Sequence, residues 1–131
     1  MAEGAQLMSV QFSKAAVIEK NKTAIEACNQ SIDRLEKIVG LPTSKETERL
    51  IQLSRAKNER TQLRAVNAHL KAAGTTVKPM DDAIASELND LGNRLDQKIR
   101  NNLIINATID FITSVLGDVN KLRGIVAGHQ G

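Results

Sequence analysis

Residues 103–116 read LIINATIDFITSVL, and this stretch decides which fold the chain can adopt. At 100° per residue, its apolar side chains fall on two faces of a helix, with Ile105, Ile109, Ile112 and Leu116 on one and Ile104, Phe111 and Val115 on the other. A helix that is apolar on nearly its whole circumference is a buried helix. The stretch contains Asn106 and Asp110 and is shorter than the ~20 residues of a bilayer span, so it predicts burial within protein.

The first of these faces continues upstream in the same helical register, through Ile84, Leu88, Leu91, Leu95 and Ile99. This continuity predicts one long helix over about residues 79–117, with Pro79 at its start and acidic residues in its first turn. Asn102 and Asn106 interrupt the apolar seam. We interpret these asparagines in one of two ways. Either they are core residues whose amides hydrogen-bond to a neighbouring residue, or they pair with other amides and so specify one alignment of the helices.

Glycine and proline cluster between periodic segments at residues 40–42 and 74–79. Because both residue types end helices, these clusters divide the chain into three long helical segments. The first two helices are predicted over roughly residues 7–39 and 44–73. Thr43, with a glutamate three residues later, predicts a capping box at the start of the second helix.

The 131 residues therefore predict a single all-α domain. Short connections make consecutive helices antiparallel neighbours, and the fold class is an elongated antiparallel three-helix bundle. Only 2% of the residues are aromatic, and no stretch alternates as a strand does. The segment 119–131 contains three glycines and predicts either a partly frayed end or a short fourth helix.

A three-helix monomer covers one face of its third helix and would leave the other apolar face as an exposed patch. We interpret this patch as a contact surface for self-association or for a partner helix, which predicts an oligomer and a non-enzymatic adaptor, chaperone or assembly factor. The candidate contact residues are Ile104, Ile105, Ile109, Phe111, Ile112, Val115 and Leu116. The alternative is that residues 119–126 fold back over the second face within one chain.

Charge is unevenly distributed within the net charge of +3. Residues 41–78 carry eight basic and three acidic groups, and residues 79–118 carry three basic and seven acidic groups. One stripe of the predicted second helix contains Lys57, Arg60, Arg64 and Lys71. An exposed basic stripe predicts contacts to the phosphate backbone of a nucleic acid. The alternative is that these side chains face the carboxylates of the third helix, which suits the small net charge and the absence of Tyr and Trp.

Residues 69–74 read HLKAAG, late on the second helix. This segment resembles the phosphoacceptor motif of histidine phosphotransfer domains, which are also helical bundles. The resemblance implies His69 as a phosphorylated residue, but Ala72 and Ala73 stand where that motif has lysine and glycine. His69 otherwise falls on the polar face of its helix, which predicts an exposed and chemically silent side chain.

No catalytic or metal-binding motif is recognised, and no cofactor or small-molecule substrate is expected. Cys28 is the single cysteine and lies on the apolar seam of the first helix, where it predicts a small core residue. One cysteine cannot form a disulfide within the chain, and the first 20 residues carry no secretory signal. These features predict a cytoplasmic protein without a membrane segment.

Overall fold

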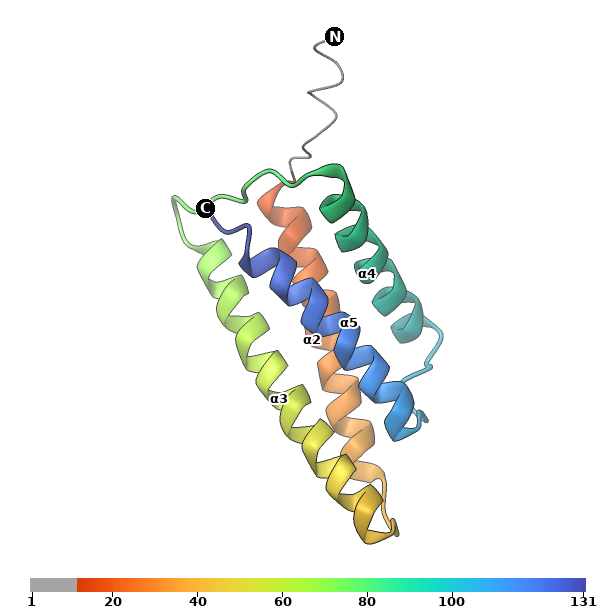
Figure 1. The fold of residues 1–131 in the computed structure, drawn as a ribbon. Coiled ribbons are helices and arrows are strands. Elements are labelled where there is room, and N and C mark those ends of the chain that lie inside the picture. Colours follow the sequence, from red (N-terminus) through yellow and green to blue (C-terminus); the bar gives the residue numbers. More distant parts are fainter. Residues whose placement is uncertain (1–11) are drawn as a thin grey trace.

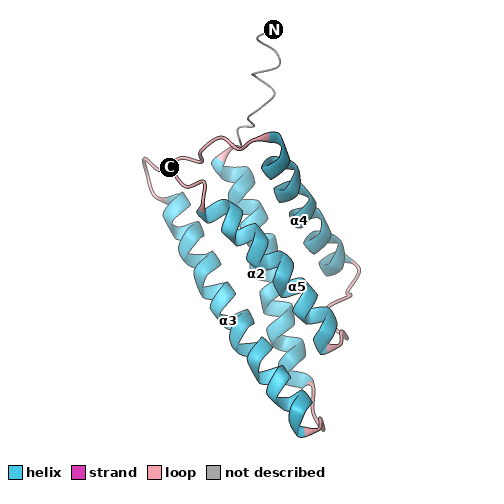
Figure 2. Ribbon diagram, viewed as in Figure 1, coloured by secondary structure: helices cyan, strands magenta, loops and turns pink. Residues whose placement is uncertain are grey.

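The computed structural model describes residues 12–131, which form four helices and no strand (Figures 1 and 2). The helices are α2 (Lys14–Lys37), α3 (Thr43–Lys71), α4 (Asp82–Arg100) and α5 (Ile109–Ala127). The predicted all-α class is confirmed, whereas the predicted count of three helices is wrong. The predicted start of the first helix near residue 7 lies outside the described residues.

Each of the four helices runs opposite to the one before it in the chain (Figure 1). α2 and α5 contact each other, and each of them also contacts both α3 and α4. α3 and α4 make no contact, so they occupy opposite corners of the bundle. The connection from α3 to α4 therefore crosses one end of the bundle, where its Val77 and Met80 are buried.

The predicted third helix is broken in two at residues 101–108. α4 ends in a Schellman motif, in which the Leu103 amide donates to the Lys98 carbonyl (2.9 Å) and the Asn102 amide donates to the Ile99 carbonyl (3.1 Å). Asn102 adopts a left-handed conformation with φ 57°, which asparagine tolerates better than most residues. α5 then begins at Thr108, whose hydroxyl accepts a hydrogen bond from the Phe111 amide (3.2 Å).

The C-terminal segment extends α5 and then packs against another part of the chain. α5 continues to Ala127 and buries Val119, Leu122 and Val126 against the other helices. Beyond it, the backbone pairs with the α3–α4 connection: the Lys78 amide donates to the His129 carbonyl (2.7 Å), and the Gly131 amide donates to the Thr76 carbonyl (2.8 Å). These backbone bonds fix the end of the chain on the bundle.

The predicted helix ends are partly confirmed. Gly40 (φ 75°) and Gly74 (φ 82°) adopt the left-handed conformation in the turns that follow α2 and α3. The capping box predicted at Thr43 is wrong, because Pro42 occupies the N-cap position and makes no side-chain cap. α4 begins at Asp82 and not at Pro79, and the Asp81 carboxylate caps it by accepting a hydrogen bond from the Ile84 amide (2.8 Å).

The left-handed residue in the break gives a first prediction. Asn102→Ala is expected to lower the free energy of unfolding by about 1 kcal/mol, because alanine is strained at positive φ, and Asn102→Gly should leave it unchanged or raise it. Urea denaturation measures both changes. Asn101→Ala is the matched control, since Asn101 has φ −89°, and its effect should stay within about 0.5 kcal/mol. An equal loss for Asn101→Ala and Asn102→Ala would contradict the Schellman geometry.

Candidate functional site

The contact surface predicted from residues 104–116 is mostly buried within the chain. Ile104, Ile112, Val115 and Leu116 have no exposed surface, and Ile109 is 8% exposed. Phe111 is half-buried beneath the Lys98 ammonium, which lies 5.4 Å from the centre of its ring. Because the break at residues 101–108 lets α5 fold back along α4 and between α2 and α3, the predicted exposed apolar row is absent from this stretch.

The two asparagines that were predicted to lie in the core are on the surface. Asn102 and Asn106 are exposed in the α4–α5 connection, so neither can align helices within a core. A buried amide pair does occur elsewhere, where the Asn21 side-chain amide donates to the Asn67 carbonyl oxygen (2.9 Å) between α2 and α3. The sequence did not reveal this pair, because its two asparagines are 46 positions apart and only the packing of α2 against α3 brings them together.

Exposed apolar side chains gather instead at one end of the bundle, where the α2–α3 and α4–α5 connections lie (Figure 1). Within the described residues, all five large hydrophobic side chains that are exposed belong to these connections or to the early turns of α3. They are Val39 (83% exposed), Leu50 (51%), Ile51 (58%), Leu103 (49%) and Ile105 (47%). We call this set the apolar end.

The α2–α3 hairpin extends past α5 at the apolar end (Figure 1). A groove of about 290 Å³ separates the hairpin from the start of α5, with Ile38 and Leu41 on one wall and Ala107 and Ile109 on the other. The Arg34 guanidinium spans these walls by donating to the Ala107 carbonyl (2.9 Å). The hairpin tip is therefore tied to the rest of the bundle but is covered by it only in part.

The basic stripe of α3 is largely exposed, but it does not face α4. Arg64 and Lys71 are exposed, Arg60 donates to the Asn29 side-chain oxygen (3.1 Å), and the Lys57 ammonium lies 4.0 Å from the Glu36 carboxylate. Since α3 and α4 make no contact, the predicted pairing of this stripe with the carboxylates of residues 79–118 is wrong for α4. Nucleic-acid binding through the stripe stays a prediction, which double replacement of Arg60 and Arg64 by glutamine would test.

A buried ion pair joins α3 to α5. The Glu59 carboxylate, 4% exposed, accepts a hydrogen bond from the Arg123 guanidinium (2.5 Å) and another from the Asn120 amide (2.8 Å). Charge-assisted bonds of this kind are stronger than neutral ones, and they fix the axial position of one helix against the other. Glu59 thus holds α3 against α5.

His69 is exposed near the C-terminal end of α3. Its ring makes no hydrogen bond or ion pair with any part of the chain that the structure describes. Phosphotransfer at His69 remains an untested prediction, and uptake of phosphate from a donor such as acetyl phosphate would test it. The placement on a polar helix face agrees with the expected solvent exposure.

Cys28 lies fully buried in the core, as the seam of the first helix predicted. Burial, reinforced by the nearby Glu59 carboxylate, raises the pKa of the Cys28 thiol to about 12. In the unfolded chain the thiol ionises near its ordinary pKa of about 8.5. A thiol with these properties is a poor nucleophile and a poor metal ligand at neutral pH.

The raised pKa predicts a pH-dependent loss of stability. The contribution of Cys28 is fully present below the unfolded pKa and is lost as the pH rises toward about 12, because ionisation of the unfolded thiol then favours unfolding. Urea titrations between pH 8 and about 11 should give a shallower fall in the free energy of unfolding for Cys28→Ala than for the parent chain. Parallel curves would show that the folded thiol ionises as easily as the unfolded one.

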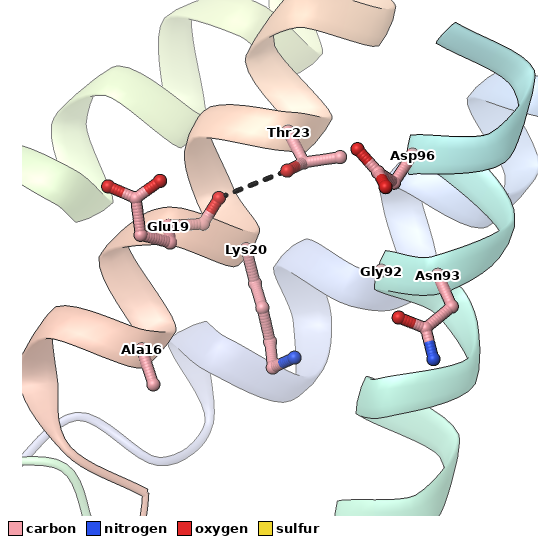
Figure 3. Close-up of a pocket in the computed structure, with 7 residues that line it drawn as sticks. All are labelled: Ala16, Glu19, Lys20, Thr23, Gly92, Asn93 and Asp96. Carbon is pink, nitrogen blue, oxygen red and sulfur yellow. Dashed lines mark hydrogen bonds between the residues drawn. The ribbon is translucent and has the colours of Figure 1, made fainter. Parts of the chain in front are cut away.

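A second groove, of about 310 Å³, lies between α2 and α4 (Figure 3). Lys20 extends across Gly92, where a Cβ atom would lie 3.7 Å from the Lys20 side chain. Burial lowers the pKa of Lys20, and its ammonium lies 5.6 Å from the centre of the Phe12 ring. The neighbouring Asp96 carboxylate pairs with Arg100 (2.9 Å). The groove thus accommodates Lys20, and the Thr23 hydroxyl beside it donates to the Glu19 backbone carbonyl (3.2 Å).

Within residues 12–131, no three His, Cys, Asp or Glu side chains come together in a way that could hold a metal ion. None of the four described helices combines the length and the apolar character that crossing a bilayer requires. Comparison of the chain with models of known protein families, with curated proteins and with solved structures gave no match. The apolar end is therefore the strongest candidate site that the geometry offers.

Proposed function

We propose that this protein is a non-enzymatic helical interaction protein, such as an adaptor, chaperone or assembly factor, that acts by protein association at the apolar end. The residues first expected to make the contact do not support this proposal, because all but Ile105 are wholly or partly covered within the bundle. The single buried Cys28 suits a reducing, cytoplasmic compartment.

The observation that supports the proposal is the position of the exposed apolar side chains. Single exposed hydrophobic residues are common on protein surfaces, but a gathered set marks an interaction surface. Here Val39, Leu50, Ile51, Leu103 and Ile105 occupy one end of the bundle. At the opposite end, the described large apolar side chains of the crossover connection, Val77 and Met80, are buried. The asymmetry favours a partner at the apolar end.

Site-specific photo-crosslinking tests this proposal. A photoreactive amino acid is placed at position 51, on the apolar end, and at position 90, an exposed position on α4 that serves as the matched control. After irradiation of cells that naturally make the protein, covalent adducts are sized and identified by mass spectrometry. We expect a discrete adduct from position 51 and none from position 90. Absence of a discrete adduct at position 51 would overturn association at this end.

A further inference from the structure

The outward face of α3 lacks charged side chains, although charges are frequent elsewhere on this helix. At 100° per residue, an arc of about 120° that is turned to solvent holds no Lys, Arg, Asp or Glu. Its central part consists of Thr47, Leu50, Ile51, Ser54, Asn58 and Thr61, all exposed. The face that a helix turns to solvent normally carries its charges, so their exclusion from this arc points to contact with another surface.

The charged residues that border this arc form a self-complementary pattern. Glu48 and Arg55 lie on one border, and Glu46 and Lys57 lie on the other. Each pair is centred at the same point, midway between residues 51 and 52. Suppose that two copies of α3 lie antiparallel, related by a two-fold axis at that point. Glu48 of one copy then lies opposite Arg55 of the other, and Glu46 lies opposite Lys57.

The same axis places the apolar residues at the centre of the contact. Ile51 of each copy lies beside the axis, and Leu50 flanks it, while Thr47 and Ser54 are small enough to let the helices approach closely. Glu46 is held by the partly buried Arg49 guanidinium (2.6 Å), whereas Glu48 and Lys57 have only exposed partners within one chain, such as the Lys45 ammonium 3.4 Å from the Glu48 carboxylate. Exposed pairs of this kind contribute little, so they can exchange for partners in a second copy.

We infer that Leu50 and Ile51 of the apolar end are covered by a second copy of this chain, docked antiparallel through α3 with Glu48 opposite Arg55 of the other copy. This inference rests on the proposed function of association and names its partner. A contact between single helices is at the small end of protein interfaces. The dimer therefore forms reversibly, and its population rises with concentration.

Size-exclusion chromatography with light scattering over a concentration series tests the pairing. Refractive index measures the concentration, since the chain has no Trp or Tyr. The mass of the parent chain is expected to rise from 14.2 kDa toward twice that value. Each single reversal, Glu48→Arg or Arg55→Glu, places like charges opposite one another across the axis. At the protein concentration at which the parent chain is half dimeric, each single variant should therefore keep a mass of 14.2 kDa.

The double variant E48R/R55E restores opposite charges across the axis and should restore the dimer. Lys121→Glu, an exposed reversal on α5, is the control and should leave the dimer unchanged. Circular dichroism confirms that every variant retains its helices. A dimer that resists both single reversals, or a double variant that stays monomeric, would overturn this geometry. A parent chain that is monomeric throughout overturns the second copy as occupant, whereas a position-51 adduct with a different protein would still support the proposed function.

Discussion

Replacing Arg123 by alanine is expected to lower the free energy of unfolding by about 3 kcal/mol or more, because it leaves the Glu59 carboxylate buried without its cationic partner. Asn120 alone would remain to donate a hydrogen bond to Glu59 (2.8 Å). A buried charge without a counterion costs more than the pair itself contributes, which makes the single removal severe. Urea denaturation followed by far-ultraviolet circular dichroism measures the change.

The matched control for this experiment is Lys121→Ala, two residues away on the exposed side of α5, where the effect should stay within about 0.5 kcal/mol. Replacing both partners with apolar residues of similar size, E59M/R123L, should recover most of the lost stability. If Arg123→Ala costs no more than Lys121→Ala, water reaches Glu59 and the ion pair does not hold α3 against α5.

Ile104→Ala is expected to lower the free energy of unfolding by about 2–5 kcal/mol, since its side chain is fully buried and its removal leaves a cavity. Ile104 lies in the α4–α5 connection, so this loss would loosen the turn that brings α5 back onto the bundle. The neighbouring Ile105 provides a close control, because it is the same residue type and is 47% exposed. Ile105→Ala should cost less than about 1 kcal/mol.

The two isoleucines also distinguish the four-helix fold from the single long helix that the sequence suggested. In a continuous helix over residues 79–117, Ile104 would lie on the exposed row, and its truncation would weaken association more than folding. In the four-helix fold, truncation of Ile104 destabilises the monomer. Equal and small effects at both positions would contradict the burial of Ile104.

The sequence predicted the helical class correctly. Apolar residues at helical spacing identified the buried face of α4, and the two glycine-containing turns separated α2 from α3 and α3 from α4. The position of Cys28 on a buried seam was also predictable. These features depend on local backbone preferences and on the spacing of side chains along one helix, both of which are written in the sequence.

The candidate site was predicted less well, because exposure depends on which helices meet. Ile104 and Val115 were expected to be exposed and are buried, whereas the exposure of Leu50 and Ile51 was not anticipated. No periodicity within α3 could show that its first turns extend past α5. The pairing of Glu59 with Arg123 joins residues 64 positions apart and was likewise invisible in the sequence.

The break at residues 101–108 shows which features follow from local sequence preferences and which follow from tertiary packing. Asn102 and Thr108 are good residues for ending one helix and starting another, but the apolar pattern of residues 103–116 also fits a continuous helix. Local preferences separate these choices by about 1 kcal/mol. Burial of Ile112, Val115, Leu116, Val119 and Leu122 in α5 contributes several times that amount. The sequence by itself determined that the helices form and which faces are apolar; the tertiary structure decided where the chain turns back, because only packing against α2, α3 and α4 buries both faces of α5.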